Sequence, residues 1–146
     1  MEHIFRVIDA SIGNFEVNDR ILQRLQRKEF GRMSGINVMS WIESFEKRHL
    51  YLSTQIKYIG IENDVQHAGL TSYYLTICEF FNADFFKSEP DDIKLSVLEK
   101  CFHIAEAHAY AMMADQATEH GLKTPLMEPT PAEKIREWSM DFISKQ

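Results

Sequence analysis

The chain has 146 residues, of which 45% are hydrophobic and 26% are charged, and its formal net charge at pH 7 is −6. These values exclude an intrinsically disordered chain, and the length fits a single domain over residues 1–146 with one hydrophobic core. The negative charge is concentrated in residues 61–146, which carry 7 basic and 15 acidic side chains. Because such a surface is repelled by phosphates, the charge favours a basic protein partner over a nucleic acid.

The sequence shows neither a membrane span nor a secretory signal. No apolar run approaches the ~20 residues that cross a bilayer, and the stretch MEHIFRVIDASIGN carries acidic residues where a signal carries basic ones. Cys78 and Cys101 each lie within an apolar segment and have no cysteine nearby in the sequence. Free buried thiols are typical of a reducing compartment, so we expect a cytoplasmic protein without membrane contact.

Apolar residues recur at helical spacing in the first part of the chain. Residues 1–12 fit a short helix or a strand, and we expect a helix because no other segment offers a strand for pairing. Residues 15–31 repeat apolar side chains on one face and end near Gly31. Residues 37–60 give the clearest amphipathic pattern, a stripe formed by Val38, Trp41, Ile42, Phe45, Leu52, Ile56 and Ile59. The spacing predicts a helix in each segment.

Two longer helices are predicted in the middle of the chain. Residues 64–84 are apolar around much of the helical circumference, which places this segment at the centre of a bundle. The next helix extends to Gly121. It starts at a capping Ser88, with Pro90 in the first turn and acids that complement the helix dipole at Asp91 and Asp92.

A last helix follows the connector LKTPLMEPTP. Thr130 and Glu133 have the spacing of a capping box, and the helix that they begin lines one face with Ile135, Trp138 and Phe142. The sequence therefore predicts an all-α fold, a single-domain bundle of five or six helices.

A group of histidines and acids in residues 101–121 raises the question of a metal site. In carboxylate-bundle metal centres, Glu and His project inward from several helices, often as Glu-x-x-His. Glu99, His103 and Glu106 form one stripe, but their order differs from that motif and no second segment repeats it. A surface stripe with His103 between two acids is the simpler interpretation, so we expect no metal, no cofactor and no catalytic residues. A helical-bundle metal-dependent enzyme that uses these three residues is the first alternative.

Basic residues form a second stripe, made of Arg20, Arg24, Arg27 and Lys28 and extended by Arg32. Such a stripe can contact phosphates, but it can also dock on an acidic surface of the same chain or of another subunit. A nucleic-acid-associated regulator that uses Arg20, Arg24 and Arg27 is the second alternative.

An aromatic pair surrounded by acids is the strongest candidate for a partner-binding site. Phe85 and Phe86 lie at a predicted helix junction, between Asp84 on one side and Glu89, Asp91 and Asp92 on the other. Acids around an apolar anchor are typical of an interface that attracts a basic partner. The competing interpretation is that one or both rings fill the core.

Together these observations predict a non-catalytic acidic helical binding protein, not an enzyme. Its expected role is to occlude or regulate a basic protein partner, as inhibitor, immunity and antitoxin proteins do. A homo-oligomer is compatible with this prediction, and nucleic acid is not expected as a partner.

Overall fold

The largest element of the computed structural model is a four-stranded antiparallel sheet, built in the strand order β1-β4-β3-β2. Its strands are β1 (Phe5–Val17), β2 (Arg32–Glu46), β3 (His49–Glu62) and β4 (Val65–Phe80). The structure describes residues 4–125 and 127–146, and of residues 32–44 it describes the main chain. The predicted all-α bundle of five or six helices is therefore wrong, and the chain has an α+β fold.

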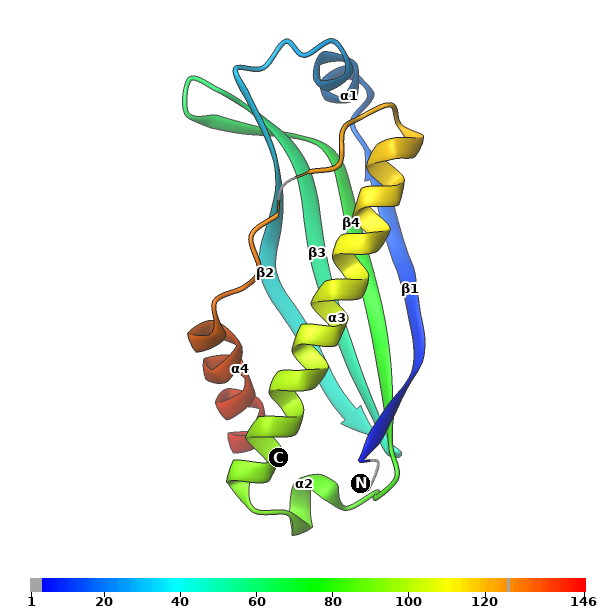
Figure 1. Cartoon of the computed structure of the whole chain (residues 1–146), viewed down its shortest axis with the longest axis vertical. Coiled ribbons are helices and arrows are strands. Elements are labelled where there is room, and N and C mark those ends of the chain that lie inside the picture. The colour runs from blue at the N-terminus through cyan, green and yellow to red at the C-terminus, as the bar shows by residue number, and fades with distance from the viewer. Residues whose placement is uncertain (1–3, 126) are drawn as a thin grey trace.

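Helices cover one face of this sheet (Figure 1). The long helix α3 (Asp91–Glu119) runs along the sheet, and α4 (Ala132–Ser144) lies beside its first half. The short helices α1 (Asp19–Gln26) and α2 (Phe85–Ser88) lie at opposite ends of the molecule. The face turned toward α3 is called the inner face below, and the opposite one the outer face.

Side-chain burial along β3 and β4 alternates with a period of two residues, which is the period of a strand that packs on one face. The alternating buried members on β3 are Leu50, Leu52, Thr54, Ile56 and Tyr58, and Ile59 after them is buried as well. On β4 they are Leu70, Ser72, Tyr74, Thr76, Cys78 and Phe80. In residues 37–60, apolar residues three or four positions apart were interpreted as one face of a helix. These residues belong to β2 and β3. The 64–84 segment looked apolar on all sides because the outer face of β4 is apolar too.

Two tight turns connect the last three strands. The turn between β2 and β3 consists of Lys47 and Arg48, with φ of 52° and 72°, and the turn between β3 and β4 consists of Asn63 and Asp64, with φ of 52° and 62°. Positive φ at both central residues is the signature of a type I′ hairpin. Asp64, which was expected to begin a helix, therefore belongs to a turn.

The three remaining helix predictions locate real helices. α1 lies inside the predicted segment 15–31, while residues 5–17, including most of the segment 1–12, form β1. α3 starts after Pro90 and not at the predicted cap Ser88, which is the last residue of α2. It ends before Gly121, whose φ of +70° suits glycine. α4 begins at Ala132 without a side-chain cap, so the predicted capping box with Thr130 does not form.

Two clusters of buried side chains fill the space between the sheet and the helices. The first cluster joins the start of β3 and the end of β4 to α2, α4 and the first half of α3. The second cluster joins the second half of β3 and the first half of β4 to α1 and the second half of α3. Ile56 is fully buried and Phe45 is half-buried with its ring against Phe80, while the side chain of Trp41 lies outside the described residues.

Both cysteines are free and belong to the first cluster. Cys78 of β4 and Cys101 of α3 are neighbours in space although they are far apart in the sequence. The Cys101 thiol donates a hydrogen bond to Cys78, and this bond together with burial raises the pKa of the Cys101 thiol well above its ordinary value. These thiols therefore act as core residues that join β4 to α3.

Candidate functional site

The aromatic pair of the predicted partner-binding site lies in the core. Phe85 and Phe86 are 2% and 5% exposed. The ring of Phe86 packs against Phe45 and Phe142, with centroid separations of 4.6 Å and 5.2 Å, and the ring of Phe85 lies 5.0 Å from that of Phe80. The two rings therefore connect α2 to the sheet, and that of Phe86 also connects it to α4, so little of either ring is exposed.

The acids around that pair lie at the surface. Asp84, Asp91 and Asp92 are exposed, and Glu89 is half-buried. Asp91 also forms an ion pair with Lys94 at 3.4 Å. Partner binding by these four acids stays a prediction, without the aromatic anchor that was expected beside them.

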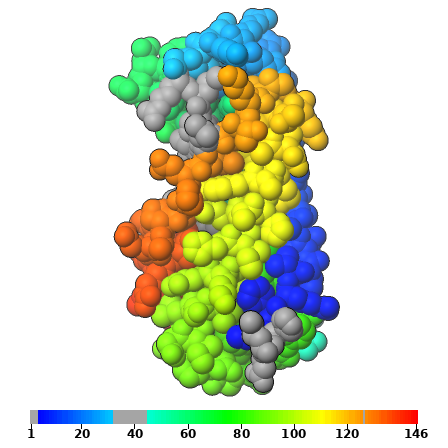
Figure 2. Space-filling view, viewed as in Figure 1, coloured from blue at the N-terminus to red at the C-terminus, as the bar shows by residue number. Residues whose placement is uncertain are grey.

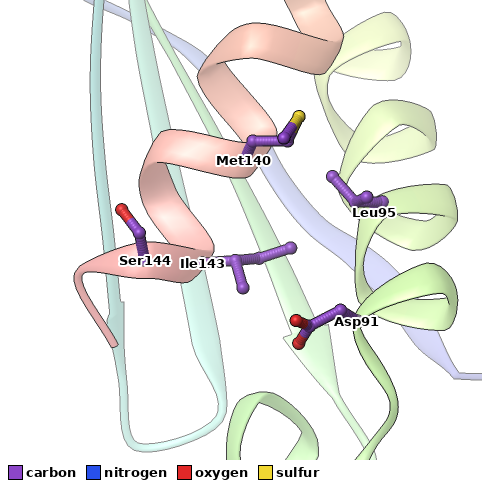
Figure 3. A pocket seen from close by; sticks show the side chains of 5 residues that line it. All are labelled: Asp91, Leu95, Met140, Ile143 and Ser144. Atoms are coloured by element: carbon purple, nitrogen blue, oxygen red, sulfur yellow. The ribbon is translucent and has the colours of Figure 1, made fainter.

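Two hollows border this end of the molecule. One, of about 190 Å³, lies between α3 and α4 and is lined by Asp91, Leu95, Met140, Ile143 and Ser144 (Figure 3). The other, of about 340 Å³, is lined by Phe45, Glu46, Lys47, Ala83, Phe86, Lys87 and Gln146. Each combines apolar walls with one or a few charged groups.

The stripe of Glu99, His103 and Glu106 does not come together as a site. Glu99 forms an ion pair with Arg136 of α4 at 3.8 Å, and His103 is exposed. Glu106 is buried and accepts hydrogen bonds from the amide and the hydroxyl of Thr130. Among residues 4–31, 45–125 and 127–146, no three His, Cys, Asp or Glu side chains are grouped as a metal site requires.

The basic stripe is partly used within the chain. The guanidinium of Arg24 bonds the carboxylate of Glu62 and lies 4.2 Å from the centre of the Phe30 ring. This contact ties α1 to the end of β3. Arg20 and Arg27 are exposed on α1, so only part of the predicted stripe faces solvent.

The outer face of the sheet carries an apolar surface that the sequence reasoning missed. Tyr51 of β3 lies directly opposite Ile77 of β4, and Leu75 and Tyr73 follow along β4 at two-residue steps. We call these four side chains the apolar band. All four are half-buried, and both hydrophobic clusters of the described residues lack them. The alternation of Tyr73, Leu75 and Ile77 with the buried residues of β4 was the available signal.

Polar side chains lie at one end of the apolar band. The carboxylate of Glu79 accepts hydrogen bonds from the Arg6 guanidinium at 2.9 Å and from the His49 ring at 3.2 Å. The bonds from His49 and Arg6 hold the pKa of the Glu79 carboxyl below its ordinary value. Because Arg6, His49 and Glu79 belong to three adjacent strands, this network fixes the relative positions of β1, β3 and β4.

An acidic group lies beside the band on β1. Asp9 pairs in register with Ile77, and it has no ion-pair partner among the residues that the structure describes. The outer face thus combines an apolar centre with an unneutralised carboxylate. This arrangement can hold an apolar chain and attract a positive charge next to it.

Within residues 4–125 and 127–146, no helix has both the length and the apolarity that crossing a bilayer requires.

Comparison with known proteins does not assign a family or a function to the chain. No protein-family model matches the chain, and no curated protein matches it.

Proposed function

We propose that this chain is a non-catalytic cytoplasmic binding protein that holds an extended, apolar segment of another polypeptide, flanked by basic residues, on the outer face of its sheet. By covering that segment it would occlude or regulate its partner, in the manner of an inhibitor, immunity protein or antitoxin. The observation that carries the proposal is the half-exposed apolar band of Tyr51, Tyr73, Leu75 and Ile77.

The apolar band suits a polypeptide in an extended conformation. Its side chains stand on two neighbouring strands, so they form a shallow ridge and not a closed pocket. An extended segment that lies on a sheet presents every second side chain to it, which matches the two-residue repeat of Tyr73, Leu75 and Ile77. Tyrosine is also enriched in protein interfaces, because its ring is apolar and its hydroxyl tolerates water.

The negative charge of this chain supports a partner segment with basic residues at its flanks. The chain has a net charge of −6, and Asp9 places a carboxylate directly beside Ile77. A basic residue at the flank of the bound segment would meet this carboxylate, and the field of the whole chain would increase its association rate. The exposed acids Asp84, Asp91 and Asp92 contribute to the same field.

The proposal is tested with two fluorescent peptides of about 12 residues that share an apolar centre of alternating Val and Leu. One peptide has Lys and Arg at its flanks and the other has Asp and Glu. We expect the basic peptide to bind with the higher affinity in a fluorescence anisotropy titration, and the difference to shrink as salt screens the charges.

A paired substitution tests the place of binding. Leu75→Thr with Ile77→Thr removes apolar surface while keeping residues that favour strands, and it should weaken binding by about tenfold or more. Val65→Thr is the matched control, because Val65 is an exposed apolar residue next to the β3–β4 turn and outside the band. Equal affinities for the paired variant, the control and the unaltered chain would show that the band is not the binding surface.

A further inference from the structure

β1 is an edge strand with an uncovered side. It pairs with β4 on one side, and the sheet order places no strand on its other side among the described residues. Main-chain N–H and C=O groups therefore point outward along a strand of 13 residues. Long apolar edges of this kind pair readily with another strand.

Exposed apolar side chains are concentrated at the same edge. Nine large hydrophobic side chains are exposed among the described residues, and five of them are Ile4, Val7, Ile8, Ile12 and Val17. In the space-filling view, β1 lies along one flank of α3, whereas the connector and α4 cover the other flank (Figure 2). Two inner-face residues of β1, Val7 and Ile12, are 36% and 44% exposed, whereas Phe5 and Phe15 on the same face pack against the two core clusters.

We propose that two copies of this chain associate through β1, which pairs antiparallel with β1 of the second copy about a two-fold axis at Ser11. The two four-stranded sheets then form one continuous sheet, with both sets of helices on one side. The occupant is a second copy because the strand is complementary to itself in charge and in side-chain pattern. This inference rests on the edge of the sheet and does not depend on the proposed peptide binding.

β1 is complementary to β1 of the second copy when all 13 residues of the two strands are paired. Ser11 is the midpoint of Phe5–Val17, so full overlap brings Arg6 opposite Glu16 of the second copy. Both residues lie on the outer face, because their partners on β4, Glu79 and Thr71, do. Opposite charges at facing positions stabilise an antiparallel pair, and the two-fold axis repeats this pair at the other end.

The inner face is complementary in the same register. Phe5 meets Val17, Val7 meets Phe15 and Ala10 meets Ile12 of the second copy, and each of these pairs joins two apolar residues of the inner face. A shift by one residue would place inner-face residues opposite outer-face ones, and a shift by two would separate Arg6 from Glu16. Irregularities near Ile8 and Gly13 lie on either side of Ser11. In the proposed register Asp9 faces Gly13 and Ile8 faces Asn14, so regular pairing covers residues 10–12 at the centre and residues 5–7 with 15–17 at both ends.

The mass of the chain in solution is the first measurement. Light scattering coupled to size-exclusion chromatography should give twice the chain mass of 17.1 kDa at micromolar concentration. Glu16→Arg should raise the dissociation constant of the dimer by about tenfold or more, since it places like charges opposite each other. Asp92→Arg is the control, with the same change of charge at an exposed position on α3.

A disulfide tests the register. Directly paired Cα atoms in an antiparallel sheet lie about 4.5 or 5.5 Å apart, within the range that a disulfide spans, so Ser11→Cys should yield a covalent dimer under mild oxidation. Asp9→Cys should not, because the two copies of residue 9 would lie about 13 Å apart along the strands. Cys78 and Cys101 are fully buried, so the unaltered chain should form little disulfide-linked dimer as background.

A monomeric mass for the unaltered chain would overturn the proposal. So would cross-linking of Asp9→Cys in place of Ser11→Cys, because it requires another register. The Leu75→Thr and Ile77→Thr pair leaves β1 intact and should leave the mass at that of the dimer. Loss of peptide binding and loss of dimerisation are thus separate results.

Discussion

The carboxylate of Glu106 shows how a single residue connects distant parts of this chain. It is 4% exposed on α3, where it accepts a 3.0 Å hydrogen bond from the amide of Thr130 and a second one from the Thr130 hydroxyl. A hydrogen bond to a buried charged group contributes more than one between neutral groups, about 1.5–3 kcal/mol. This contact holds the connector before α4 against the middle of α3.

Removing one donor tests this contribution. Thr130→Val keeps the shape and the amide but removes the hydroxyl, and it should lower the free energy of unfolding by about 2 kcal/mol. Thr130→Ser retains a hydroxyl and should restore most of that loss. Urea denaturation of both variants gives the comparison, and equal stabilities for them would show that the hydroxyl is not the stabilising group.

Residue-scale sequence reasoning found Glu106 and Thr130 but assigned them other roles. Glu106 was expected on a surface stripe beside His103, with a metal ligand as the alternative, but it is buried. Thr130 was expected to cap the last helix with Glu133. Each role is the one favoured by neighbours in the sequence. The actual pairing joins residues 24 positions apart, and it depends on the connector returning to α3.

At the scale of elements, the hairpins illustrate which local signals are strong. The Asn63–Asp64 turn contains residues that tolerate positive φ, whereas Lys47 and Arg48 have no such preference. Positive φ costs a residue with a Cβ roughly 1–2 kcal/mol. The β2–β3 turn therefore forms because the paired strands require it, and not because its sequence favours it.

Lys47→Asn with Arg48→Gly should therefore stabilise the protein. Asn-Gly is the preferred pair for a type I′ turn, and we expect the free energy of unfolding to rise by about 1–2 kcal/mol. The control is Arg48→Ala, which removes the charge of Arg48 but keeps a Cβ at positive φ and should give no such gain. A double variant no more stable in urea than Arg48→Ala would contradict the turn geometry.

At the scale of the whole molecule, the sheet requires contacts between distant parts of the chain. Phe5 pairs with Phe80 at one end of the β1–β4 ladder, across the whole of α1, β2 and β3. Closing such loops before their contacts form slows folding. A bundle of helices with the same length would instead be dominated by local contacts.

Folding should accordingly take milliseconds to seconds, the range of proteins rich in non-local strand pairing. Stopped-flow refolding from urea, followed by tryptophan fluorescence, measures this rate. Repeating it at several protein concentrations separates chain folding from association of β1 edges, because only association becomes faster with concentration. Refolding complete in microseconds would be inconsistent with a rate limited by long-range pairing.

The sequence by itself determined the acidic character of the chain and the positions of α1, α3 and α4. These features are local: Pro90, Asp91 and Asp92 begin α3 and Gly121 follows its end, whatever lies around them. The sheet was decided only by the tertiary structure, because strand pairing joins residues that share no local signal. Leu52 and Ile56 fit a helical spacing until the pairing of β3 with β4 shows them on one face of a strand. The same pairing decided which aromatic residues face solvent: it buried Phe85 and Phe86 under the end of the sheet and left Tyr51 and Tyr73 on its outer face.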